Sequence, residues 1–256
     1  MILRIMRGVC LLLIGGVTAG SLASAELPPP FSSLNTSDTD LAFSGMELFN
    51  RARFNLWSAQ GSTEINENLL NRAAADFESI SNPAAESYFM SRVELYRGRL
   101  ALETESKRIA RSYFVNSMNL AKKSLTQVES SEALRVLADA GSSWMITKGL
   151  GGIIKMAPQV QQWSSRSLEI DSQNALALII NTQGQINAPK NAGGNPEEAI
   201  RRLTTLISRT DLDNIERFWA EISLYQTNKK LKRREQAEIW YESAEQIFPN
   251  SPFLEK

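Results

Sequence analysis

The chain has 256 residues, of which 28 are basic and 28 acidic, and 43% of its residues are hydrophobic. This balanced charge leaves no excess of positive side chains for binding nucleic acid. The sequence has no histidine, and its single cysteine is Cys10. Without these residue types, catalysis is left to carboxylates, lysine, serine and tyrosine, so we predict no catalytic residue, no metal ligand and no cofactor.

Residues 1–25 have the pattern of a secretory signal peptide. Two arginines precede an apolar run from Val9 to Val17, and the small residues Ala23-Ser24-Ala25 suit cleavage near Ala25. The run is shorter than the roughly 20 apolar residues that a membrane span needs. Cys10 stands at the start of the run rather than after it, which disfavours lipid attachment. The sequence therefore predicts a periplasmic or secreted protein.

Residues 26–40 are predicted to form a flexible linker. Pro28-Pro29-Pro30 and the Ser, Thr, Asn and Asp residues that follow offer few apolar groups to bury. From Leu41 onward, apolar residues recur at spacings of three and four, without the alternation of a strand. Residues 41–256 are therefore predicted to form one helical domain.

Several helix boundaries can be read within this domain. The segment Asn195-Pro196-Glu197-Glu198 supplies a cap, a first-turn proline and two acids, so a helix is predicted from there to about Ser208. Another helix is expected from Ser131 to Lys148. The predicted breaks, which give roughly ten helices, are Gly61-Ser62, Asn82-Pro83, Gly149 to Gly152, Asp171-Ser172, Gly193-Gly194 and Asp211 to Asn214.

The short breaks favour antiparallel helix hairpins, and the hairpins repeat. Val160, Ala199 and Ala237 are each predicted to open the second helix of a pair, and they lie 39 and 38 positions apart. A period of this length is typical of stacked helical repeats. The predicted fold class is all-α, namely an α-solenoid of about five antiparallel helix hairpins.

The last unit resembles a tetratricopeptide repeat (TPR). Leu224 lies in its first helix, and the motif's small, aromatic, small and proline positions are taken by Ala237, Tyr241, Ala244 and Pro249. The fit has gaps, because the aromatic residue expected early in each first helix is missing and Ser164 stands where a bulky residue is usual. The resemblance implies a TPR-like solenoid.

The stretch from Lys148 to Pro252 is similar to the exported helical accessory component of TRAP-type solute transporters. Its more distinctive feature is Ala188-Pro189 followed by Gly193-Gly194 and a second helix. This resemblance implies a protein that associates with the periplasmic solute-binding component of such a transporter, and self-association into a homo-oligomer stays open.

In repeats of this type the first helix of each pair lines the concave face, so a partner is expected to bind its outward residues. Amides, one aromatic ring and one cation suit a peptide or a small polar ligand, although an ordinary polar helix face explains the same residues equally well. The predicted partner-binding residues are Asn181, Gln183, Asn187, Trp219, Gln226 and Lys229.

Other tryptophans are assigned by their place in the repeat. Trp144 and Lys148 could occupy an equivalent concave surface, and Trp144 could equally belong to the core. Trp163 and Trp240 fall on the apolar stripes of second helices, so we expect them to pack.

Polar and glycine clusters have structural explanations that we weigh against functional ones. Acidic pairs, which could act as acid and base or bind a hard cation, are better explained as helix caps and solvated faces. The glycine clusters lack a following Gly-Lys-Ser/Thr, so they are expected in turns rather than around phosphate. The basic cluster from Lys229 to Arg234 could touch anionic lipid or an acidic partner, but a solvated turn explains it better. The acidic pairs are Glu197-Glu198, Asp211 with Asp213, and Glu242 with Glu245.

These observations favour a non-enzymatic binding protein that holds another envelope protein on its concave face. The specific form is an accessory subunit that docks the solute-binding component of a TRAP-type transporter. A scaffold for envelope assembly or secretion is the alternative, and a carboxylate-based hydrolase on a helical scaffold is the rival from another class.

Overall fold

The computed structural model describes residues 27–104 and 106–254, so the expected signal peptide lies outside the described residues. Within these ranges the chain forms ten α-helices, two short 3₁₀ helices at Phe31–Ser33 and Lys190–Ala192, and no strand. The α-helices are α1 (Thr36–Ser58), α2 (Thr63–Glu78), α3 (Pro83–Thr104), α4 (Lys107–Gln127), α5 (Ser131–Lys148), α6 (Leu150–Ile170), α7 (Ala175–Asn187), α8 (Pro196–Ile207), α9 (Asn214–Lys230) and α10 (Arg234–Ile247).

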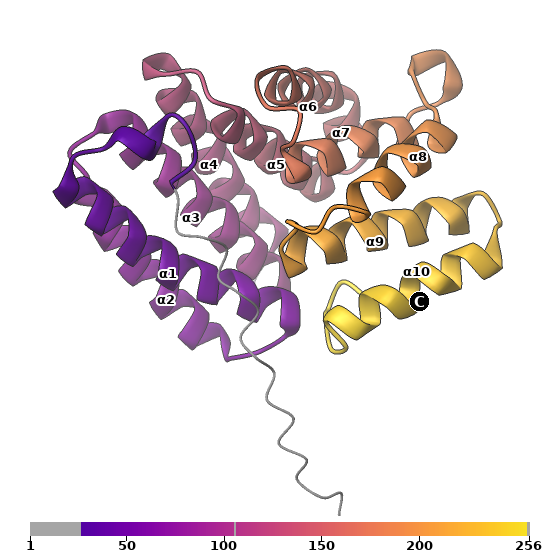
Figure 1. Cartoon of the computed structure of the whole chain (residues 1–256), viewed down its shortest axis with the longest axis horizontal. Coiled ribbons are helices and arrows are strands. Elements are labelled where there is room, and N and C mark those ends of the chain that lie inside the picture. The colour runs from indigo at the N-terminus through magenta and orange to yellow at the C-terminus, as the bar shows by residue number, and fades with distance from the viewer. Residues whose placement is uncertain (1–26, 105, 255–256) are drawn as a thin grey trace, which may run out of the picture.

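The helices pair into five consecutive antiparallel hairpins, from α1/α2 to α9/α10. Each helix contacts the next along the chain, and the first helices α1, α3, α5, α7 and α9 also contact one another in that order. Figure 1 shows the hairpins following one another around an arc, with α9 and α10 returning toward α1. The predicted all-α class, an α-solenoid of helix hairpins, is therefore confirmed.

Side-chain caps set most of the helix starts. Asn195 accepts a hydrogen bond from the backbone N–H of Glu198, and Pro196 is the first residue of α8, as predicted. The expected helix from Ser131 to Lys148 is α5, which Ser130 caps in the same way. Because each cap satisfies backbone N–H groups that have no partner inside the helix, these polar residues place the hairpin turns.

Part of the expected linker is folded. Leu27 and Phe31 are buried, and the ring of Phe31 stacks on that of Tyr88 with centroids 4.9 Å apart. Helix α1 begins at Thr36, where Asn35 caps it, rather than at Leu41. A few well-placed apolar residues are enough to anchor this otherwise polar segment to α3.

Helix α6 begins earlier than the repeat pattern predicted. Gly149 alone makes the turn, with φ of 65°, and the helix then runs from Leu150 through Pro158 to Ile170. Val160 therefore lies inside α6, whereas Ala199 is near the start of α8 as expected. About two additional helical turns precede the repeat position in the third hairpin.

Glycines on the first helices let the hairpins pack closely. A Cβ atom added to Gly45 would overlap the ring of Phe77, and one added to Gly98 would overlap the ring of Phe114. Both rings come from the second helix of the same hairpin and are fully buried. The first two hairpins therefore depend on a glycine opposite a phenylalanine.

We predict that Gly98→Ala lowers the free energy of unfolding by about 1–2 kcal/mol. Forcing Phe114 aside costs about 1–3 kcal/mol, and the higher helix propensity of alanine offsets part of that. Urea denaturation followed by circular dichroism measures the change.

Gly151→Ala is the matched control for this prediction. Gly151 also lies inside a helix, but a Cβ added there meets nothing within 4 Å. Its variant should therefore be as stable as the original chain or up to about 1 kcal/mol more stable. Equal losses in both variants would contradict the close-packing account.

Candidate binding surface

An arginine nearly enclosed by aromatic rings lies where four first helices meet. The guanidinium carbon of Arg99 in α3 lies 5.6 Å from the ring centroid of Trp57 in α1 and 5.3 Å from that of Trp219 in α9. Its Nη2 also donates to Asp139 of α5 at 2.6 Å. Arg99 is only 9% exposed, so one side chain joins α1, α3, α5 and α9.

The first and last hairpins are in direct contact. Arg53 in α1 forms an ion pair of 2.8 Å with Asp213, which precedes α9. Trp57 also packs against Phe218 and Phe253, with ring centroids 5.8 and 4.3 Å apart. These contacts join the first and last hairpins along the edge between α1 and α9. We call the set Arg53, Trp57, Arg92, Arg99, Glu132, Asp139, Asp213, Glu216 and Trp219 the inner face.

Opposite charges on α3 and α5 are matched across the inner face. Arg92 and Arg99 are seven residues apart, as are Glu132 and Asp139, so each pair lies on one side of its helix. The guanidinium of Arg92 lies 4.4 Å from the ring centroid of Phe49, and its charge helps lower the pKa of Glu132. This spacing is a sequence signal that could have identified these four residues, yet our prediction missed them.

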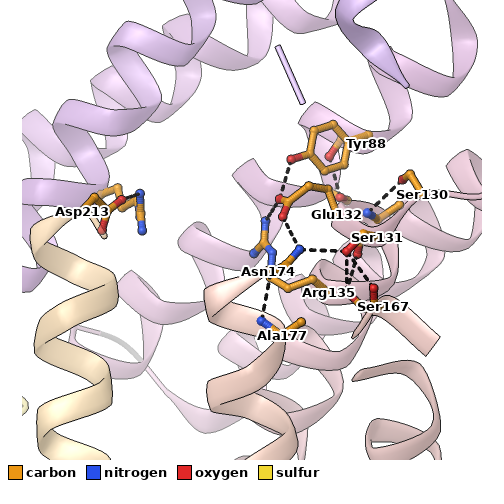
Figure 2. Close-up of polar contacts among 12 residues, drawn as sticks. Tyr88, Ser130, Ser131, Glu132, Arg135, Ser167, Asn174, Ala177 and Asp213 are labelled. Atoms are coloured by element: carbon orange, nitrogen blue, oxygen red, sulfur yellow. Dashed lines mark hydrogen bonds and ion pairs between the residues drawn. The ribbon is translucent and has the colours of Figure 1, made fainter. Parts of the chain in front are cut away.

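Glu132 is the centre of a buried polar cluster. Its carboxylate accepts hydrogen bonds from Arg135 at 2.7 Å, from the hydroxyl of Tyr88 at 3.0 Å and from Asn174 at 2.6 Å, as Figure 2 shows. Burial on its own would raise the pKa of Glu132, but Arg135 and the other donors outweigh it and lower that pKa to about 2. Burial and the Glu132 charge raise the pKa of Tyr88 to about 12. The charged form of Glu132 is therefore strongly favoured.

The same cluster continues into the junction between the third and fourth hairpins. Asn174, which caps α7 through the N–H of Ala177, also donates to the hydroxyl of Ser131 at 3.0 Å. The hydroxyls of Ser131 and Ser167 lie 2.9 Å apart. These contacts hold neighbouring helices in register, so this part of the cluster is structural.

Two carboxylates at the start of α9 have opposite pKa shifts. Asp213 and Glu216 form a reciprocal capping box, in which each side chain accepts a hydrogen bond from the backbone N–H of the other. Although burial opposes it, the charge of Arg53 holds the pKa of Asp213 below its usual value. Burial and the negative charge of Asp213 raise the pKa of Glu216.

The three predicted residues of α7 have different surroundings. Asn181 is 5% exposed, and its amide nitrogen donates hydrogen bonds to the hydroxyls of Ser164 and Ser165. It therefore faces α6 instead of the solvent. Gln183 is half-buried and donates to Ser223 of α9 at 2.9 Å. Asn187 is exposed and donates to Gln183. Of these three predicted residues, Gln183 and Asn187 have amide groups that reach solvent, and Asn181 does not.

The three predicted residues of α9 also differ in their surroundings. Trp219 is half-buried and belongs to the inner face, with its ring 5.7 Å from that of Trp57. Gln226 and Lys229 are exposed, and Lys229 donates to the hydroxyl of Tyr225 at 2.9 Å. The structure brings Trp219 to Arg99 and leaves Gln226 and Lys229 further along the same helix.

The remaining tryptophans are half-buried against apolar clusters. Trp144 and Trp163 pack against the large core, and Trp240 packs against the clusters of the last two hairpins. Lys148 lies beside Trp144, with its Nζ 5.8 Å from the ring centroid.

Most of the acidic residues that were weighed as acid–base pairs have arginine partners. Glu197 pairs with Arg233, Glu198 with Arg201 and Asp211 with Arg209. In the described part of the chain, no group of three or more Asp, Glu, His or Cys residues is placed to hold a metal ion. None of the helices in that part is both long and apolar enough to cross a membrane.

Two cavities lie outside the inner face. One of about 360 Å³ is lined by Phe31, Leu34, Pro83 and Val128, and another of about 240 Å³ by Glu67, Asn71, Arg97 and Tyr113.

The chain matches no family model and no curated protein. The inner face is therefore the candidate site because of its geometry and chemistry alone.

We predict that Glu132→Gln lowers the free energy of unfolding at neutral pH by about 2 kcal/mol, since it leaves Arg135 without its charged partner. The full penalty for a buried pair is larger, but a quarter of the Glu132 side chain is exposed. Because the folded pKa of about 2 is below the ordinary value of 4.5, this stabilisation is complete above about pH 5 and is lost as the pH falls toward 2. Urea denaturation across that pH range measures it, and the variant should show a shallower decline.

Glu216→Gln is the control of opposite sign. The glutamine side chain can still accept the hydrogen bond of the capping box. The substitution also removes a carboxylate whose pKa is raised by burial and by the charge of Asp213. We expect this variant to be at least as stable as the original chain near neutral pH. A loss matching that of Glu132→Gln would contradict the assignment of the two carboxylates.

Proposed function

We propose that this chain is a binding protein of the bacterial envelope that holds a protein partner on its inner face and catalyses no reaction. The observation that supports this best is the convergence of Arg92 and Arg99 of α3 with Trp219 of α9 on one surface. Tryptophan and arginine dominate the energetics of protein interfaces, because they bury large areas and still form directed polar contacts.

The proposed partner is the solute-binding component of a TRAP-type transporter, and the chain would be its accessory subunit. This specific form depends on the resemblance of the stretch from Lys148 to Pro252 to that accessory component. The leader pattern in residues 1–25 supports a periplasmic location. A small polar ligand in place of the protein partner, and self-association into a homo-oligomer, stay open within this proposal.

The mechanism is docking. The half-buried ring of Trp219 would fill an apolar recess of the partner, and Arg92 would pair with its acidic groups. Gln183, Asn187, Gln226 and Lys229 would form a polar rim that sets the orientation. Because Arg99 is already paired with Asp139, it would position Trp219 and not bind the partner itself.

Two alternatives differ in partner or in class. A scaffold for envelope assembly or secretion would use the same surface for a different protein. A carboxylate-based hydrolase would need an acid with a raised pKa beside a charged carboxylate, and Glu216 beside Asp213 is the pair that fits this requirement. Glu216→Gln tests this alternative, since it would abolish hydrolysis by this pair.

We predict that Trp219→Ala reduces partner binding at least about tenfold, the loss typical of an aromatic interface residue. Affinity purification of the tagged chain from its own envelope extract, followed by quantitative mass spectrometry, measures this. The expected outcome is enrichment of a periplasmic solute-binding component with the original chain and its loss with the variant.

Trp240→Ala is the matched control, since it removes a half-buried tryptophan on the second helix of the same hairpin. Its partner binding should be unchanged once the folded fraction is taken into account by circular dichroism. Enrichment of an assembly or secretion component would favour the scaffold alternative. If the two tryptophan variants behave alike, the inner face is not the binding surface.

A further inference from the structure

The tip of the α5/α6 hairpin extends beyond the repeat that follows it. Helices α5 and α6 have 18 and 21 residues, compared with 13 and 12 in α7 and α8. Val160 lies ten residues after the first residue of α6, whereas Ala199, its counterpart in the repeat, lies three residues after that of α8. The additional seven residues form about two turns at the tip.

The tip of this hairpin, formed by the end of α5 and the start of α6, carries aliphatic side chains that face solvent. Ile146 is 66% exposed, Leu150 73%, Ile153 46% and Ile154 71%. Leu150, Ile153 and Ile154 have the spacing of one helix face, and Ile146 lies in the last turn of α5. We call these four residues the apolar tip. Exposed aliphatic residues are ordinary when scattered, but four gathered on one hairpin tip form a patch.

No neighbouring element of the described chain covers the turn. A Cβ atom added to Gly149 or Gly151 would meet nothing within 4 Å. Gly149 is the sole residue between the two helices, so the tip is narrow and projects into solvent. Arg111 of α4 supports it from one side by donating to the hydroxyl and carbonyl oxygens of Thr147.

The charge around the apolar tip has one sign. Lys148 and Lys155 are exposed and flank the aliphatic residues, while the sequence has no acidic residue between Asp139 and Glu169. A second copy meeting the patch tip to tip would oppose lysine with lysine. An apolar surface edged by lysines, with a half-buried tryptophan below it, instead has the chemistry that anionic lipid headgroups and acyl chains complement.

We propose that the apolar tip docks on the surface of an anionic lipid bilayer. Leu150, Ile153 and Ile154 enter the boundary between headgroups and acyl chains, and Lys148 and Lys155 pair with lipid phosphates. Trp144, one turn before Lys148, lies at the level where tryptophan is enriched in membrane proteins. The site is separate from the inner face, so this proposal holds whether or not the proposed partner is correct.

The basic cluster from Lys229 to Arg234 lacks this combination. Arg233 pairs with Glu197, and Lys230 donates to the backbone carbonyl of Ile186. Its charges are partly used within the protein, and the turn presents no comparable group of exposed aliphatic residues. It therefore serves as an internal comparison for the apolar tip.

The test is co-flotation of the chain with vesicles of three parts phosphatidylcholine to one part phosphatidylglycerol, with pure phosphatidylcholine vesicles for comparison. The chain should float with the anionic vesicles and much less with the neutral ones. Leu150→Ser combined with Ile154→Ser should weaken binding at least about tenfold. Lys148→Gln and Lys155→Gln should each weaken it about fivefold.

Ile65→Ser combined with Ile239→Ser is the matched control, since both residues are more than half exposed and lie on α2 and α10. This control should float like the original chain, and circular dichroism checks that each variant is folded. Equal flotation of control and tip variants would overturn the proposal. It would also be overturned if the original chain does not float with the anionic vesicles, or if light scattering shows that the tip joins copies of the chain instead.

Discussion

The ion pair between Arg99 and Asp139 lies where the first helices of separate hairpins meet, and the inner face is arranged around it. A nearly buried guanidinium group needs a counter-charge, which Asp139 supplies, and the rings of Trp57, Tyr96 and Trp219 add cation–π attraction. Removing any one of these partners would leave a buried charge partly unsatisfied. The positions of α1, α3, α5 and α9 are therefore linked through one side chain.

The helices were largely predictable because capping is a local property. Asn195, Ser130 and the glycine turn before α6 mark boundaries that depend only on neighbouring residues. The repeat pattern placed Val160 at the opening of a second helix, whereas α6 begins at Leu150 and runs through Pro158 to Ile170. Phe31 was missed because its burial depends on Tyr88, which is 57 positions away in the sequence.

The binding residues were harder to predict, because a solenoid helix is surrounded on more than one side. Asn181 was expected on the concave face, but it lies on the side of α7 that faces α6, where its amide donates to Ser164 and Ser165. Trp219 was expected to bind a partner and lies beside Trp57, while its arginine neighbour was missed, since Arg99 is 120 positions earlier in the sequence. Only the paired seven-residue spacing of Arg92/Arg99 and Glu132/Asp139 offered a sequence clue to that surface.

The contact between α1 and α9 changes how a short repeat array unfolds. In an open solenoid each unit contacts only its neighbours, so terminal units fray first and stability is nearly a sum over units. Here Arg53 and Trp57 bind the opposite end of the chain, and that end cannot detach without breaking contacts in the first hairpin. Closing a loop of this length costs conformational entropy and raises the contact order, so we expect slower folding. The same contacts suppress fraying of the terminal hairpins. Unfolding becomes a collective event of the whole arc.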